Sequence, residues 1–182
     1  MPANCSAAGS RGRPSKGDRQ FIATRVRADV DSSIRSIADN TKTPFGDVVG
    51  TMLLIGTRHI DQFDEVFREL LPLTRTTVDG QVQFDPSAHD AITSITGRAP
   101  TPVETRAREI RSALSPHGKI PMMLVFSTLL TIGVRNCEGD AFTGALADMY
   151  ELALDPKLAR KMLSESSIPR RLEEQGVLAL AI

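Results

Sequence analysis

Residues 20–27 form one short alternating segment, and two helical patterns follow it directly. Alternation places every second side chain of a strand on the same face. One face therefore carries Ile22, Thr24 and Val26, and the other carries Phe21, Ala23, Arg25 and Arg27. A single strand leaves the N–H and C=O groups of its edge unpaired, so it cannot fold alone. This segment must find a second strand, either in another copy of the chain or farther along the same chain.

The two helical patterns predict a strand followed by a helical pair. Asp29 or Asp31 is the expected N-cap of the first helix, because short polar side chains accept hydrogen bonds from free N–H groups at helix starts. The second helix is expected to use Thr43 as its N-cap and Pro44 as its first residue. Apolar residues at helical spacing then continue until the helix ends near residues 56–59.

Charge is segregated along the chain although the net charge is zero. Residues 1–28 contain six basic side chains and one acidic one, and residues 92–136 contain six and two. Residues 59–91 contain two basic side chains and seven acidic ones. Two basic blocks can therefore contact phosphates while acidic surfaces face elsewhere.

Residues 1–19 are rich in Gly, Ser, Ala and Arg and have little to bury, so we expect a disordered basic arm. The Arg-Gly-Arg-Pro sequence at residues 11–14 resembles the core of an AT-hook. This resemblance implies arginines that enter the narrow minor groove of A/T-rich DNA. The alternative is a solubilising tail. The expected minor-groove or phosphate contacts of the arm are Arg11, Arg13, Lys16 and Arg19.

Residues 21–58 resemble, without gaps, the ribbon-helix-helix family of DNA-binding proteins. In that family two antiparallel strands lie in the major groove and their outward side chains read base edges. The resemblance implies that Arg25 reads guanine, which arginine binds through two hydrogen bonds. The alternative for Arg25 and Arg27 is a solvated strand face. The residues expected to contact DNA from this strand are Phe21, Ala23, Arg25 and Arg27.

The same resemblance implies a phosphate contact at the start of the second helix, where free N–H groups attract anions. In this chain the corresponding residues are Phe45 and Gly46. Two features depart from the family pattern. Phe21 is not a hydrogen-bonding reader, although it can contact a thymine methyl group, and Pro44 has no N–H to donate.

A second copy of the pattern occurs downstream. Residues 43–58 and 120–135 share seven identities in sixteen positions at a constant offset of 77. Ahead of this match the offset becomes 73, because we expect the first helix of the first unit to be about four residues shorter. Residues 91–99 then become a strand and residues 103–114 a helix. The outward residues of this second strand, together with a nearby lysine, are Ser94, Thr96, Arg98 and Lys119.

Two alternatives to this repeat remain open. At an offset of 58, residues 87–97 match the first helix, residues 81–84 become the strand, and Thr101 and Glu104 form a capping box. Against this, residues 78–81 look like a tight hairpin turn. The second alternative is that there is no true repeat.

The expected fold is mainly α. It consists of two tandem ribbon-helix-helix units at 20–58 and 92–136, a short two-stranded antiparallel β-ribbon, an acidic connector at 59–91 and a C-terminal helical extension at 137–182. Two such units in one chain resemble the single-chain double ribbon-helix-helix proteins that assist conjugative or T-DNA transfer. The extension contains amphipathic helical patterns, interpreted either as extra core helices or as a surface for self-association or a protein partner.

Several function classes are not expected. No apolar run approaches the roughly 20 residues of a membrane span, so we expect no membrane association. Two cysteines indicate a reducing cytoplasm, where the protein would be associated with the nucleoid. We find no phosphate-binding glycine loop, nucleophile elbow or metal-binding spacing, so we expect no enzyme activity, no cofactor and no metal.

The resemblance therefore predicts a sequence-specific binder of double-stranded DNA. It would act as a transcriptional regulator such as a repressor, or as an accessory factor of DNA transfer or plasmid partition on a mobile element. Because the two strands differ, we expect an asymmetric rather than palindromic site. The alternative is an antitoxin or assembly factor whose C-terminal helices bind a protein partner.

Overall fold

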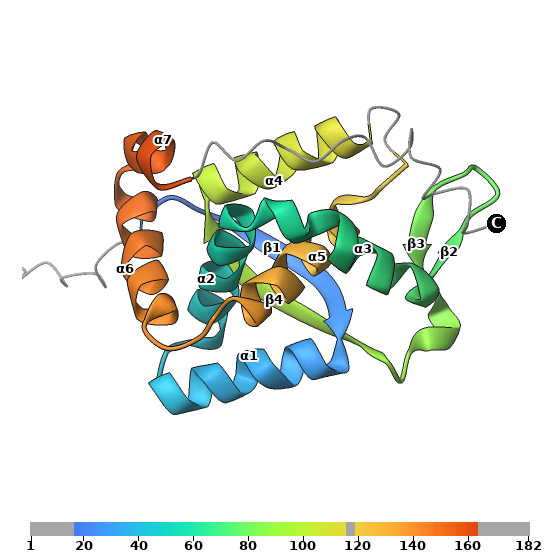
Figure 1. The fold of residues 1–182 in the computed structure, drawn as a ribbon, viewed down its shortest axis with the longest axis horizontal. Coiled ribbons are helices and arrows are strands. Elements are labelled where there is room, and N and C mark those ends of the chain that lie inside the picture. The colour runs from blue at the N-terminus through green and yellow to red at the C-terminus, as the bar shows by residue number, and fades with distance from the viewer. Residues whose placement is uncertain (1–16, 116–118, 164–182) are drawn as a thin grey trace, which may run out of the picture.

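The computed structural model describes residues 17–115 and 119–163 (Figure 1). The first half contains β1 (Arg19–Arg27), α1 (Ala28–Thr41) and α2 (Phe45–Arg58). The middle contains α3 (Phe63–Leu70), β2 (Thr74–Thr76) and β3 (Val82–Phe84). The second half contains β4 (Ile92–Pro100), α4 (Thr101–Leu114) and α5 (Met122–Arg135), followed by α6 (Ala141–Leu154) and α7 (Ala159–Met162). The expected mainly helical class with a small two-stranded antiparallel sheet is confirmed.

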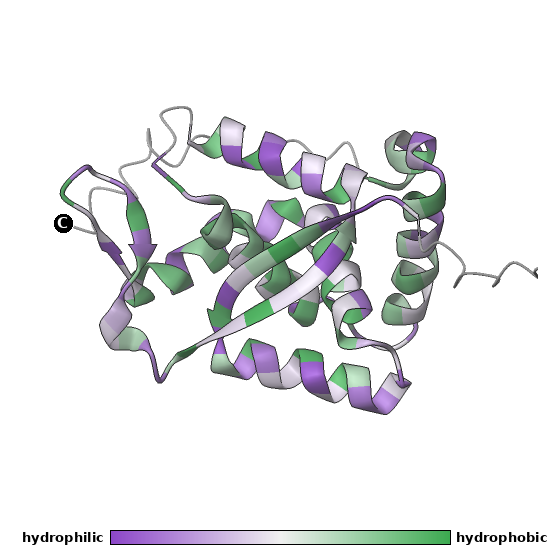
Figure 2. Ribbon diagram, turned by 180° about the vertical axis from the view of Figure 1, so that it is seen from behind, coloured by the Kyte–Doolittle hydropathy of each residue, from purple (hydrophilic) through white to green (hydrophobic). Residues whose placement is uncertain are grey.

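Strands β1 and β4 pair with each other within the chain, as predicted. They are antiparallel, and the register runs from Arg19 opposite Pro100 to Arg27 opposite Ile92. This pairing satisfies the edge of the otherwise isolated first strand. Figure 2 shows the resulting ribbon in front of the other elements, with α1 and α4 to either side of it.

The two halves have equal elements in the same order. Strand β4 and helix α4 repeat the bounds of β1 and α1 at an offset of 73, and α5 repeats α2 at an offset of 77. The prediction of a shorter first helix is wrong, because α1 and α4 both have 14 residues. The extra residues lie in the segment 115–121, which corresponds to 42–44 in the first half.

The alternative alignment at an offset of 58 is wrong. Residues 92–100, which it made mostly helical, form β4, and β3 pairs with β2 rather than with β1. The predicted tight turn joins β2 to β3, and Gly80 adopts a φ of +78° there. That backbone conformation favours glycine.

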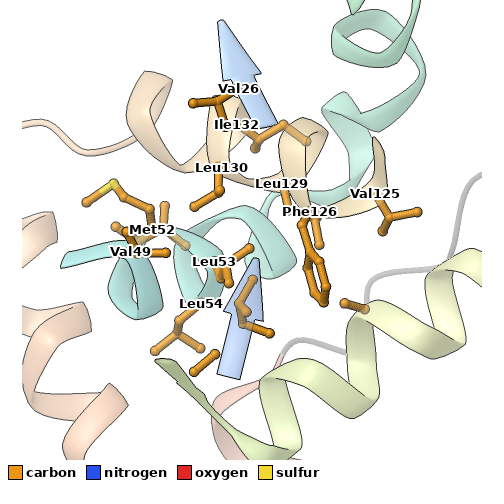
Figure 3. Packing of buried hydrophobic residues seen from close by; sticks show 14 of the residues in the cluster. Val26, Val49, Met52, Leu53, Leu54, Val125, Phe126, Leu129, Leu130 and Ile132 are labelled. Atoms are coloured by element: carbon orange, nitrogen blue, oxygen red, sulfur yellow. The ribbon is translucent and has the colours of Figure 1, made fainter. Parts of the chain in front are cut away.

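Helices α2 and α5 cross beneath the ribbon and form the centre of the core. Figure 3 shows the aliphatic side chains that interdigitate there, among them Val49, Met52, Leu53, Leu129 and Leu130. The backbones approach closely at Gly56 and Gly133. A Cβ atom at Gly56 would overlap the carbonyl oxygen of Leu129, and one at Gly133 would overlap that of Met52. These two contacts are equivalent at the offset of 77, so the crossing is nearly symmetric.

The acidic connector is a packed part of the fold. Phe63 and Phe67 of α3 stack with ring centroids 5.8 Å apart, and both side chains are buried. Val82 of β3 donates a backbone hydrogen bond to Lys119, which ties the hairpin to the segment before α5. The connector therefore carries the chain from the end of α2 to the start of β4 and also extends the core.

The predicted helix caps are wrong. Arg27 occupies the N-cap position of α1 and Pro44 that of α2, and neither end has a side-chain cap hydrogen bond. Strand β1 runs directly into α1, which leaves no separate capping residue. Asp31 instead forms an ion pair with Arg35 one turn later.

The described part of the C-terminal extension contributes to the core. Phe142, Ala145, Met149 and Leu152 of α6 are buried in the same cluster as α2 and α5. The core interpretation of α6 is thus confirmed, whereas a protein partner for the C-terminal helices stays a prediction. The part of the predicted helical extension from residue 164 onwards lies outside the described residues. Among the described residues, no helix is long and apolar enough to cross a membrane.

Candidate nucleic-acid interface

The ribbon has one buried face and one exposed face, with the alternation that the sequence predicts. On the inner face Ile22, Val26 and Ile95 are buried against the helices. On the outer face Phe21 is 66% exposed, which is unusual for a large apolar side chain. The exposed outward residues are Phe21, Ala23 and Arg25 from β1 and Ser94, Thr96 and Arg98 from β4.

The register arranges these six residues as three cross-strand pairs. Ala23 lies opposite Thr96 in the middle of the ribbon. On either side of this central pair, Phe21 lies opposite Arg98 and Arg25 lies opposite Ser94. The structure thus brings the predicted readers of both strands together on one surface, with an arginine toward each end and the small central pair between them.

Arg25 and Arg98 have no ion-pair or hydrogen-bond partner among residues 17–115 and 119–163. Both are exposed, so their guanidinium groups are open to a ligand. The next arginine along β1, by contrast, has partners within the protein. Arg27 donates hydrogen bonds to Asp29 and also lies 3.7 Å from Glu69. The positive charge of Arg27, which is one of the predicted strand contacts, is therefore already neutralised by carboxylates of the protein.

Glu69 connects Arg27 to the end of α5. It accepts hydrogen bonds from Arg135, and these lower the pKa of the Glu69 carboxyl below its usual range. The carboxylate is therefore held in its charged form beside two arginines. This ion cluster fixes the end of the ribbon to α3 and α5.

Arg19 does not fit its predicted role as a DNA contact. Its side chain is 3% exposed and donates to Asp47 at 2.6 Å. Tyr150 of α6 donates to the other oxygen of Asp47 at 2.7 Å, and its ring centroid lies 5.0 Å from the Arg19 guanidinium carbon. Burial and the hydrogen bond to Asp47 raise the pKa of the Tyr150 hydroxyl. Arg19 therefore joins the ribbon to α2 and α6 inside the protein.

The arm ends earlier than expected. Asp18 donates a backbone hydrogen bond to Ala153 of α6 at 2.8 Å, and Arg19 begins β1. Residues 17–19 are thus part of the fold. The remaining predicted arm contacts, Arg11, Arg13 and Lys16, lie outside the described residues.

The starts of α2 and α5 lie at equivalent places beside the ribbon. Gly46 is close enough to β4 that a Cβ atom there would lie 3.7 Å from the Cα of Gly97. At the equivalent position in the other half, Thr24 of β1 donates a hydrogen bond to the carbonyl of Met123 at 2.7 Å. The backbone N–H groups of Phe45 and Gly46 make no hydrogen bond within the described chain. Such N–H groups at a helix start can bind an anion, and the phosphate contact at this turn stays a prediction.

Two lysines precede these helix starts at equivalent positions. Lys119 was predicted, and Lys42 was missed, although the offset of 77 relates one to the other. Both are exposed. Lys42 ends α1 in a left-handed conformation with φ of 55°. The repeat in the sequence was the signal from which Lys42 could have been predicted as the equivalent of Lys119.

An open pocket lies at the Arg25 end of the ribbon. Arg25, Ile92 and Ser94 line it from the strands, and Pro86 and His89 line it from the end of the connector. His89 is 75% exposed and sits 3.3 Å from Asp90. The sequence did not single out His89, because only the fold brings residue 89 beside residue 25.

No protein-family model matches the chain, and no curated protein or solved structure is detectably similar to it. The role of the exposed ribbon is therefore inferred from its own residues and their arrangement.

Proposed function

We propose that the protein binds double-stranded DNA in a sequence-specific manner, with the outer face of the β1–β4 ribbon in the major groove. That groove is about 12 Å wide and admits a two-stranded ribbon. The observation that carries the proposal is the exposed outer face, on which two arginines without a partner among the described residues lie on either side of the centre. Arginine is the side chain that most often distinguishes guanine, through paired hydrogen bonds to O6 and N7.

The finer fold we propose is two tandem ribbon-helix-helix units that share one ribbon. It is supported by the equal bounds of the two halves and by the equivalent glycine contacts between α2 and α5. In this arrangement the starts of α2 and α5 bind DNA phosphates on the two sides of the ribbon. Lys42 and Lys119, which precede those helix starts, add positive charge at each place. The residues before Gly17 would follow the minor groove.

The biological role we propose is regulatory or accessory. The expected classes are a transcriptional repressor or an accessory factor of DNA transfer, and both rest on the likeness to double ribbon-helix-helix proteins rather than on a site. Either role requires the same first property, which is selective binding of duplex DNA.

Replacing Arg25 by alanine should relax sequence preference at one base pair by about 1–3 kcal/mol. Its side chain is exposed and has no partner among the described residues, so its loss should leave folding intact. The measurement starts with selection of bound sites from a random duplex pool by the unaltered protein. The affinity of each protein for the selected site and for its single-base variants is then measured by fluorescence anisotropy.

The matched control is Arg75→Ala. Arg75 is also exposed, and it lies on β2, which pairs with β3 and not with the ribbon. This variant should keep the base preference of the unaltered protein. The ribbon would not be the reading surface if Arg25→Ala left both affinity and preference unchanged. If the unaltered protein enriched no sequence from the pool, the proposed function would be wrong.

A further inference from the structure

The ribbon has an approximate twofold axis at its centre. The offset of 73 maps β1 onto β4, and the antiparallel register pairs Ala23 with Thr96, which are themselves 73 apart. The axis therefore passes between these two residues. The same exchange relates the two glycine contacts of α2 and α5 beneath the ribbon. The symmetry thus extends from the core to the outer surface.

This axis exchanges the two arginines of the outer face. Arg25 maps onto Arg98, and each lies one outward position from the central pair. At the other outward positions the two equivalent residues are of different types, since Phe21 maps onto Ser94 and Ala23 onto Thr96. The outer surface therefore carries an arginine at the same position in both halves, whereas its other outward side chains differ between the halves.

At one end of the molecule, some features of the first half have no counterpart across the axis. The equivalents of Arg19 and Asp47 are Ile92 and Leu124, so the buried ion pair beside α6 belongs to the first half alone. The connector ends beside Arg25, whereas residues 17 and 18 lie beside the opposite end of the ribbon. The protein therefore has a direction along the ribbon in spite of its repeated arginines.

Duplex DNA also has twofold axes that exchange its strands. We propose, on the basis of the DNA-binding function proposed above, that the preferred site contains one guanine on each strand, related by such an axis, within an otherwise asymmetric sequence. Arg98 lies opposite Phe21, four residues along β1 from Arg25. At about 3.4 Å per residue this separates the two arginines by about 14 Å along the ribbon, so that they reach different base pairs. In the proposed DNA site, the two guanines are thus related as an inverted repeat, and the other base pairs are not.

Away from the central pair of Ala23 and Thr96, the sequence difference between Phe21 and Ser94 sets the asymmetry. The phenyl ring has no hydrogen-bonding group and favours apolar contact such as a thymine methyl, whereas a serine hydroxyl donates or accepts at either base type. Base pairs near these two residues should therefore differ from each other, although they lie at equivalent distances from the axis.

The test compares selected sites for single variants of the ribbon. Arg25→Ala should remove the preference for one of the two guanines and Arg98→Ala the preference for the other, each by about 5- to 150-fold. Arg98→Lys should weaken the same preference while keeping most of the affinity, because lysine retains the charge without arginine's planar pair of donors. Arg75→Ala should leave both guanines selected.

A second variant tests the asymmetry directly. Phe21→Ser gives the two halves the same side chains at the outer positions, so its selected site should become more palindromic. Phe21 is mostly exposed, and its replacement should leave the protein folded.

The outcomes separate this inference from the proposed function. Selection of a site without the related guanines, or loss of the same base pair in Arg25→Ala and Arg98→Ala, would overturn the symmetric pair while DNA binding stands. An unchanged site for Phe21→Ser would overturn the assigned source of asymmetry. Absence of any enriched duplex would overturn both the inference and the function on which it rests.

Discussion

Replacing Gly56 by alanine should lower the free energy of unfolding by about 3 kcal/mol, because the added methyl group has no space. The new Cβ atom would overlap the carbonyl oxygen of Leu129, which belongs to the backbone of α5 and cannot rotate away. Helices α2 and α5 would have to separate, and the aliphatic core between them would loosen (Figure 3). Urea denaturation followed by circular dichroism measures the change.

The control for this prediction is Gly144→Ala on α6. Gly144 has nothing within 4 Å of its Cβ position and lies within a helix, so alanine should stabilise the protein by up to about 1 kcal/mol. Gly133→Ala should be as destabilising as Gly56→Ala, because the overlap with Met52 is equivalent. Equal stability of Gly56→Ala and Gly144→Ala would contradict the close crossing of α2 and α5.

Replacing Asp47 by alanine should cost about 3–5 kcal/mol of folding free energy, as expected when one partner of a buried ion pair is removed. The carboxylate is 7% exposed and is held by Arg19 and Tyr150. Nε and Nη2 of Arg19 have no hydrogen-bond partner among the described residues, so the guanidinium depends strongly on Asp47. Without it, a buried positive charge would remain uncompensated.

A double variant separates the loss of charge pairing from the loss of packing. Arg19→Met combined with Asp47→Leu removes both charges and should recover most of the stability lost in Asp47→Ala. Glu109→Ala removes one partner of a more exposed pair with Arg106 and should cost at most about 1 kcal/mol. Comparable losses for Asp47→Ala and Glu109→Ala in thermal or urea melts would show that the Arg19 pair is not buried in solution.

The pairing of β1 with β4 was predictable because few segments of the chain could serve as the second strand. A strand with an open edge needs a partner, and the repeat of residues 43–58 at 120–135 indicated where to find one. Alternation then assigned the inner and outer faces of both strands before their register was known. The burial of Ile22 and Ile95 and the exposure of Arg25 and Arg98 follow that assignment.

Other features depend on contacts that a linear pattern does not contain. Arg19 continues a run of basic residues, so it resembled the arm, yet its partners Asp47 and Tyr150 come from distant elements. The four extra residues of the second half were assigned to a helix because a constant apolar spacing fits both a longer helix and a longer turn. The position of His89 beside Arg25 likewise depends on the path of the whole connector.

The intramolecular pairing of β1 with β4 has a consequence for dosage. A ribbon made by two chains exists only when the chains have associated, so its abundance falls faster than the protein concentration on dilution. Here one polypeptide supplies both strands, and the number of complete ribbons is proportional to the number of molecules. A mutation on one strand also alters only one half of the surface, so the two halves are free to diverge independently.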